Sequence, residues 1–113
     1  MITADFFRDG GRLIGFSVRG HAGFAPEGED IVCAAVSSAV ELTANGITEI
    51  LGADACVQAP AEGEISFRLA QGSPEAEWFL RALQLQLELI AEDYPEYVRV
   101  ISPEKSCTGS DLK

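Results

Sequence analysis

The feature that most constrains the fold is the turn sequence Arg8-Asp9-Gly10-Gly11, which separates two segments of alternating character. Before the turn, Ile2, Ala4 and Phe6 occupy every second position, and after it comes the segment "RLIGFSVRG". Two alternating segments joined by a glycine-rich turn are typical of an antiparallel hairpin. We therefore predict a β-hairpin over about residues 2–20.

A helix is predicted to follow a loop that spans residues 22–29. Asp30 is a favourable N-cap, and we expect the helix to continue to about Leu51, with Gly46 as a weak point and Gly52 as its stop. Its apolar face is predicted from the helical spacing of five residues, Ile31, Ala35, Ala39, Leu42 and Ile47.

The rest of the chain predicts two short strands, a second helix and a last strand. The strands are "ADACVQA" and "GEISFRLA" around the turn "PAEG". Ser73 and Pro74 are suited to start a helix that Pro95 ends, and "YVRVIS" is the last strand. The order β-β-α-β-β-α-β predicts an α+β two-layer sandwich, with a mainly antiparallel sheet and two helices on one face.

The second helix carries more apolar residues than one buried face needs. Two stripes run along it, the first formed by Phe79, Leu83, Leu87 and Ile90 and the second by Trp78, Ala82, Leu85 and Leu89. A helix packed only on its own sheet requires a single stripe. The second stripe is therefore predicted either to be buried against the first helix or to form a homodimer interface.

Length and composition indicate one globular domain over residues 1–113, with residues 103–113 as a frayed tail. Hydrophobic residues make up 47% of the chain and charged residues 23%. The formal net charge of −10 argues against a direct nucleic-acid partner and favours a basic one. The uncharged apolar runs are too short for a bilayer and no signal peptide is evident, so we expect a cytoplasmic protein without a membrane partner.

The three cysteines do not suggest disulfides or a metal site. Cys33, Cys56 and Cys107 have no CxxC spacing, and the chain has a single histidine, His21. An odd cysteine number in a cytoplasmic protein argues against structural disulfides, and these scattered ligands do not fit zinc. We expect no metal and no cofactor.

Cys33 and His21 are candidates for nucleophilic catalysis. A free thiol with a pKa of about 8.5 is mostly protonated at neutral pH, but the first turn of a helix favours the thiolate. A histidine beside the thiol would accept its proton and later protonate a leaving group. Asp30, Cys33, Ser37 and Glu41 share one helix face by their spacing.

Structural interpretations of the same residues remain open. A cysteine in a helix rich in alanine and valine is most often a small buried residue. His21 is equally suited to a structural hydrogen bond, Asp30 to capping alone, and Ser37 to being a small helical residue. Spacing alone does not decide between these interpretations and catalysis.

The block Gly20-His21-Ala22, followed by Gly28 and then Asp30-Ile31-Val32-Cys33-Ala34 and Ser37, resembles the ribosomal-processing cysteine protease family, Prp, of Firmicutes and related bacteria. The resemblance extends to the "MIT" strand, the order of elements and the chain length. It implies a homodimeric cysteine endopeptidase that removes a short N-terminal extension from the twenty-seventh protein of the large ribosomal subunit.

The resemblance also implies roles for individual residues. Cys33 would be the nucleophile, His21 the general base and acid, and Asp30 a supporting residue. The substrate-binding residues would be Gly20, Gly23, Gly28 and Ser37, with residues 23–29 as a mobile loop covering the peptide. Two alternatives are a non-catalytic acidic adaptor that binds a basic ribosomal protein, and a thiol hydrolase or transferase acting on a small acyl substrate.

Overall fold

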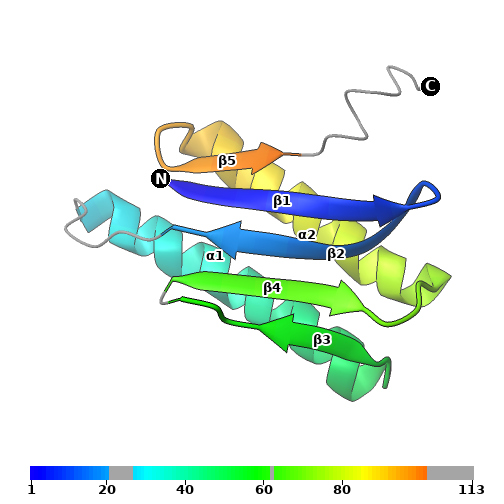
Figure 1. Cartoon of the computed structure of the whole chain (residues 1–113). Coiled ribbons are helices and arrows are strands. Elements are labelled where there is room, and N and C mark those ends of the chain that lie inside the picture. Colours follow the sequence, from blue (N-terminus) through cyan, green and yellow to red (C-terminus); the bar gives the residue numbers. More distant parts are fainter. Residues whose placement is uncertain (21–26, 62, 102–113) are drawn as a thin grey trace.

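A computed structural model describes residues 1–20, 27–61 and 63–101 of the chain, and for residues 27–30 it describes the backbone alone. Strands and helices follow one another in the predicted order (Figure 1). The elements are β1 (Ile2–Asp9), β2 (Arg12–Arg19), α1 (Glu27–Asn45), its short π-helical continuation η1 (Gly46–Ile50), β3 (Ala55–Gln58), β4 (Glu64–Leu69), α2 (Pro74–Asp93) and β5 (Val98–Ile101). The predicted frayed tail, residues 103–113, lies outside the described part.

The first two strands form the predicted hairpin. Gly10 and Gly11 have φ angles of 62° and 87°, in the left-handed region that the favoured two-residue hairpin turn requires. The strands pair antiparallel, with Phe6 opposite Phe16. The alternation also holds, because Ile2, Ala4 and Phe6 are all buried.

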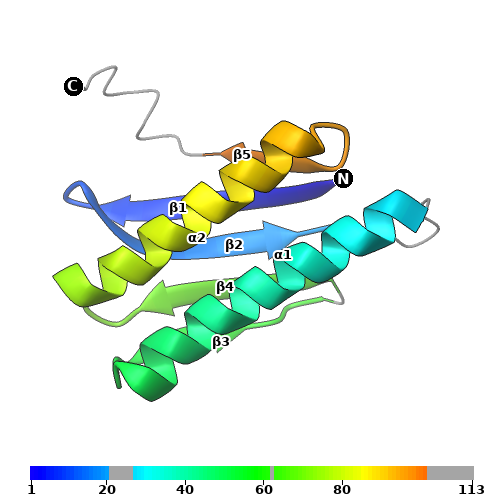
Figure 2. The ribbon, with the colours of Figure 1, turned by 180° about the vertical axis from the view of Figure 1, so that it is seen from behind.

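Within the described residues, the sheet has five strands in the order β3-β4-β2-β1-β5. Three neighbouring pairs are antiparallel, and only β1 and β5 are parallel. Both helices cover the same face of this sheet (Figure 2). The α+β two-layer sandwich with a mainly antiparallel sheet is therefore confirmed.

The core lies between the sheet and the helices. Phe16 occupies its centre, with its ring centroid 6.2 Å from that of Phe6 and 5.2 Å from that of Phe67. All three rings are essentially inaccessible to solvent. The helices close this aromatic layer with aliphatic side chains, namely Val32, Val36, Val40 and Ile47 from α1 and η1 and Leu80, Leu83 and Leu87 from α2.

The first helix begins earlier than predicted. α1 starts at Glu27, so Asp30 is inside the helix rather than its N-cap, and Cys33 lies in the second turn. Pro26 directly precedes the helix, and the acidic residues that follow it interact favourably with a helix N-terminus. The predicted loop at residues 23–29 is therefore wrong for 27–29, while 23–26 lie outside the described residues. Because the dipole field falls off within one turn, the first-turn argument for Cys33 is also wrong.

The apolar face of α1 is rotated by one residue from the predicted face. Ile31, Ala35 and Leu42 are exposed, although they were expected to be buried. Of the other two predicted positions, Ile47 is buried and Ala39 is partly buried against the core. The buried positions include Val36 and Val40, which pack on the sheet. Both sets have helical spacing, so periodicity identified the helix but not which of its two apolar faces meets the sheet.

The second helix begins as predicted. The Ser73 side chain caps it by accepting a hydrogen bond of 3.2 Å from the backbone N–H of Ala76, and Pro74 occupies the first helical position. Its second stripe is not buried against α1, because Trp78 and Leu85 are 64% and 58% exposed. Of the two predictions for this stripe, burial against the first helix is wrong.

Two glycines shape the end of the first helix. A Cβ at Gly46 would lie 2.7 Å from Cε1 of Phe79, so this glycine allows the Phe79 ring of α2 to pack directly on the helix backbone. Gly52 has a φ of 75° and ends the helix, with the N–H of Ala53 donating to the carbonyl of Ile47. The predicted weak point, Gly46, is therefore a place of close contact with α2, and the predicted stop, Gly52, is where the helix ends.

By length and composition alone, Ile31–Ile50 could cross a membrane. Val32, Val36 and Val40 in this segment are buried among the core residues. We therefore interpret it as a core helix.

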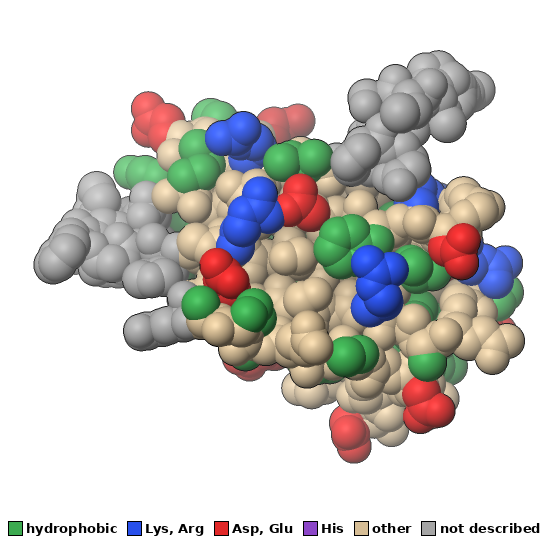
Figure 3. Space-filling view, in the orientation of Figure 1, with side chains coloured by type: hydrophobic (Ala, Val, Ile, Leu, Met, Phe, Trp, Pro, Cys, Tyr) green, Lys and Arg blue, Asp and Glu red, His purple; other side chains and the backbone are tan. Residues whose placement is uncertain are grey.

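The sheet face opposite the helices carries charges of both signs (Figure 3). Arg19 forms an ion pair with Asp5, and the Arg68 guanidinium lies 4.8 Å from the centroid of the Phe7 ring. Positive and negative side chains are interspersed over this face. The net charge of −10 therefore does not appear here as one acidic patch.

Candidate active site

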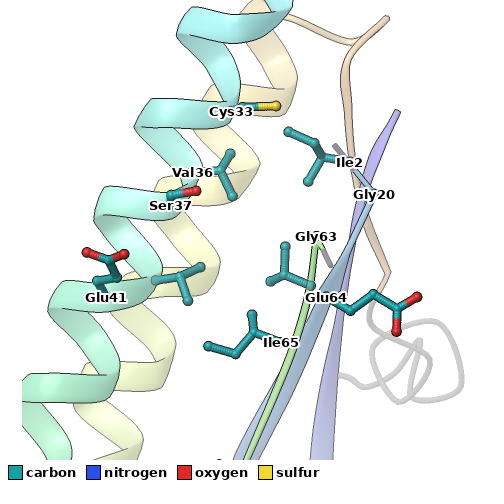
Figure 4. Close-up of a pocket in the computed structure, with 11 residues that line it drawn as sticks. Ile2, Gly20, Cys33, Val36, Ser37, Glu41, Gly63, Glu64 and Ile65 are labelled. Atoms are coloured by element: carbon teal, nitrogen blue, oxygen red, sulfur yellow. The ribbon is translucent and has the colours of Figure 1, made fainter. Parts of the chain in front are cut away.

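A groove of about 260 Å³ lies between α1 and the strand ends that face it (Figure 4). Its floor is aliphatic and its rim is polar, and the thiol of Cys33 borders it. The lining residues come from β1, the end of β2, α1 and the start of β4, and they are Ile2, Val18, Gly20, Cys33, Val36, Ser37, Val40, Glu41, Gly63, Glu64 and Ile65.

Three residues of α1 border the groove at intervals of one helical turn. Cys33, Ser37 and Glu41 all line it, which agrees with the face predicted from their spacing. Cys33 is a free, half-buried cysteine, and its side chain points from α1 toward Ile2 and Gly20 (Figure 4). The thiol is therefore accessible to a molecule in the groove without being fully exposed.

Gly20 directly follows β2 at the groove and has a φ of 94°. A Cβ at this position would lie less than 3.0 Å from the backbone oxygen of Met1. A side chain is thus disfavoured both by the backbone conformation and by the neighbouring chain. The close approach holds the last residue before His21 against the start of β1.

The other predicted site residues are only partly described. Gly28 and Asp30 lie in α1, and Asp30 precedes Cys33 by three residues, which places both positions on one side of the helix. His21 and Gly23 lie outside the described residues. His21 nevertheless follows Gly20 directly in the chain, and Gly20 lines the groove.

Sequence reasoning did not identify the strand residues that complete the groove. Ile2, Val18 and Ile65 form the wall opposite α1, and Gly63 leads into β4. Ile65 lies beside Val18 through the antiparallel pairing of β4 with β2. Ile2 is held in place by the hydrogen bond of 2.8 Å from its N–H to the carbonyl of Tyr97. The alternation of the strands marks these residues as buried, but it does not show which strand ends meet one helix.

The arrangement is suited to nucleophilic attack by a thiol on an extended substrate. The groove presents one nucleophilic sulfur at its border and aliphatic side chains along its floor. In the part of the chain that is described, no group of three or more His, Cys, Asp or Glu side chains is placed to hold a metal ion.

Known proteins share both the sequence pattern and the fold. The family model "Cysteine protease Prp" matches residues 1–99. The ribosomal processing cysteine protease Prp of Bacillus subtilis (strain 168) is 29% identical over 94 residues, which cover 78% of this chain and 84% of that protein.

Solved structures agree with this match. The essential ribosomal processing protease Prp from S. aureus in complex with a substrate peptide superimposes with a TM-score of 0.82 at 27% identity, covering 90% of this chain and 99% of that chain. Its complex with a covalently linked product peptide gives 0.79 at 28% identity, with the same coverage. A structure from Streptococcus mutans gives 0.80 at 29% identity, covering 90% of this chain and 93% of that one.

Proposed function

Since this chain belongs to the cysteine protease Prp family and is a cysteine protease, we propose that it removes an N-terminal extension from a large-subunit ribosomal protein. The substrate would be the twenty-seventh protein of that subunit. The observation that carries the proposal is the half-buried thiol of Cys33 at the border of the groove between α1 and the facing strand ends. The structural relatives with a substrate peptide and a covalently linked product peptide support the same use of this fold.

The proposed reaction passes through a thioester on Cys33. His21 takes the thiol proton, and the sulfur attacks the scissile carbonyl carbon to form a tetrahedral intermediate. His21 then gives the proton to the departing amine as the carbon–nitrogen bond breaks. Water hydrolyses the thioester and returns the thiol, so each turnover consumes one water and requires no cofactor.

The remaining predicted residues would position this pair. Because Cys33 is beyond the first turn of α1, its activation depends on His21 rather than on the helix terminus. Gly20 would fix the chain just before His21, and Asp30 would orient the imidazole from the preceding turn of α1. Ser37, one turn beyond Cys33, would contact the peptide in the groove, and Gly23 and Gly28 would form the approach to it.

Incubation with the host's extended ribosomal protein, followed by mass measurement of the products, tests this function. We expect one cut near the N-terminus, no cut by Cys33→Ala, and retained binding of the substrate by that variant. Cys56→Ala is the matched control, because Cys56 is an exposed cysteine on β3, away from the groove. Undiminished cleavage by Cys33→Ala would exclude the mechanism. Binding without cleavage by the wild-type protein would instead favour the adaptor function.

We also propose that the protein acts as a homodimer in the cytoplasm, where ribosomal proteins are made. The outer sides of both helices carry large exposed apolar residues, including Leu42 at 74% and Trp78 at 64% exposure. These sides are continuous, because Leu42 of α1 and Ala82 of α2 line one shallow groove between the helices. Such a surface on a single copy is suited to burial against an identical one.

Sedimentation equilibrium tests the assembly. We expect a dimer for the wild-type protein and a monomer for Leu85→Glu, which places a charge in the exposed stripe of α2. Gln58→Glu adds the same charge on β3 and should remain dimeric. A monomeric wild-type protein at micromolar concentration, or an unchanged mass for Leu85→Glu, would contradict the proposed interface.

A further inference from the structure

The groove beside Cys33 has a carboxylate two helical turns away from the thiol. Cys33, Ser37 and Glu41 follow one another along the same side of α1 (Figure 4). Eight residues of α-helix span about 12 Å, which separates the positions of Cys33 and Glu41 along the helix axis. The groove therefore has a nucleophile and an acidic group at fixed separation along one wall.

Of the two acidic residues that line this groove, Glu41 is the one on α1, and its carboxylate lies along the helix on the side of Ser37 (Figure 4). Glu64 also borders it, but its side chain points away from α1, as Figure 4 shows. Glu41 is exposed, and the ion pairs found among the described residues join Arg19 to Asp5 and Arg12 to Glu77. No described basic side chain pairs with Glu41, so its charge is available to a substrate.

The part of the groove near Glu41 has an aliphatic lining. Val36 and Val40 of α1 contribute the small parts of their side chains that the core leaves accessible, and the half-buried Ile65 lies across the groove. Lysine and arginine combine an apolar stem with a charged end, so their stems pack on such a surface while the charge reaches the rim. A purely aliphatic side chain would fit the floor without using the carboxylate, and an acidic one would be repelled by it.

We propose that Glu41 determines substrate specificity by binding a lysine or arginine of the peptide three or four residues from the scissile bond. An extended chain advances about 3.3 Å per residue, so a distance of about 12 Å corresponds to that number of positions. This assignment rests on the proposed function, because it requires that a peptide in the groove is cut by Cys33. Beyond that function, the proposal names the kind of substrate side chain that the groove selects and the position of that side chain along the peptide.

A peptide series with one movable lysine tests the proposal. All peptides carry the same cleavage site and otherwise uncharged residues, and the lysine moves from the fifth residue before the scissile bond to the fifth after it. For the wild-type protein we expect kcat/KM to rise about fivefold at one position, three or four residues from the cut. The preference should weaken at high ionic strength, because salt screens a partly exposed pair.

Variants of Glu41 separate a specific contact from general attraction. Glu41→Gln should cleave every peptide at the rate of the lysine-free one, and Glu41→Lys should prefer glutamate at the same position. Glu49→Gln is the matched control, because it removes one exposed acidic charge of η1 outside the groove and should keep the lysine preference. Cleavage by the wild-type protein with no positional preference, or a preference that persists in Glu41→Gln, overturns this proposal and leaves the proposed function intact.

Binding measurements distinguish a failure of the Glu41 proposal from a failure of the proposed protease function. Fluorescence polarisation measures the affinity of the inactive Cys33→Ala variant for each peptide. We expect the tightest binding at the lysine position that gives the highest kcat/KM. The double variant Cys33→Ala, Glu41→Gln should bind all the peptides equally. If the wild-type protein cleaves none of the peptides nor the ribosomal protein, the proposed function fails and this proposal fails with it.

Discussion

Gly20 offers a direct test of how the groove is built. Its φ of 94° costs a residue with a Cβ about 1–2 kcal/mol. The added Cβ in Gly20→Ala would also overlap the backbone oxygen of Met1, and a backbone atom cannot rotate away as a side chain can. Overpacking of this kind typically costs about 1–3 kcal/mol. We therefore expect Gly20→Ala to lower the free energy of unfolding by about 2–5 kcal/mol.

The matched control is Gly52→Ala. Gly52 has a similar φ of 75°, but a Cβ there meets no heavy atom within 4 Å. It should lose only the conformational cost, about 1–2 kcal/mol, so the difference between the variants reports the contact with Met1. Urea unfolding followed by circular dichroism measures both values. Equal losses in the two variants would refute the steric part of the reasoning.

A loss of activity should accompany the loss of stability. Relieving the overlap requires the end of β2 to move by about 1 Å, and a misplacement of that size in a catalytic group costs on the order of 100-fold in rate. Since His21 follows Gly20 directly, we expect that loss of kcat/KM under conditions where Gly20→Ala remains folded. Gly52→Ala should cleave at the wild-type rate. Cleavage by folded Gly20→Ala within twofold of wild type would show that Gly20 does not position His21.

Three further outcomes follow from the packing and the site. Gly46→Ala places a Cβ 2.7 Å from the ring of Phe79 and should lower the free energy of unfolding in urea by about 1–3 kcal/mol. Adding Phe79→Leu should restore part of this loss, and an unchanged free energy in Gly46→Ala would contradict the close packing of the helices. Ser73→Ala removes the N-cap of α2 and should cost about 1 kcal/mol in the same assay, whereas Ser73→Asp should not. Alkylation of Cys33 at neutral pH should be faster than that of the more exposed Cys56, as measured by peptide mass spectrometry. His21→Ala should remove this difference in rate. Equal alkylation rates of the two cysteines in the wild-type protein would exclude activation of the resting thiol.

Most of the fold could be predicted because its signals are local. The hairpin follows from two glycines that supply positive φ between alternating segments, and α2 follows from Ser73 and Pro74 at its start. The parallel pairing of β1 with β5 could not be read in the same way, because it joins Ile2 to Val98 across nearly the whole chain. No local pattern in either segment specifies the other as its neighbour.

In the candidate site, too, the residues on one helix could be predicted, whereas those brought together from distant strands could not. Helical spacing placed Cys33, Ser37 and Glu41 on one face, and all three border the groove. The opposite wall depends on how strand ends are brought together by the sheet, so the sequence marked Ile2 and Ile65 as strand residues but not as residues of the groove. The start of α1 was misplaced because Asp30 is a good cap by residue type, although acidic residues are equally favourable inside the first turn.

The wrong face predicted for α1 has a physical cause that also bears on assembly. A helix with one surface to bury needs one apolar stripe, yet both helices carry two. The stripes that the core leaves unused, with Ile31 and Leu42 on α1 and Trp78 and Leu85 on α2, are all exposed, and the groove between the helices connects them through Leu42. Periodicity could not choose between the faces of α1 because each has a surface to cover, the sheet on one side and a proposed second copy on the other. The same helix carries Cys33 between these two surfaces, so dimer formation would hold α1 from the side that its own sheet leaves free.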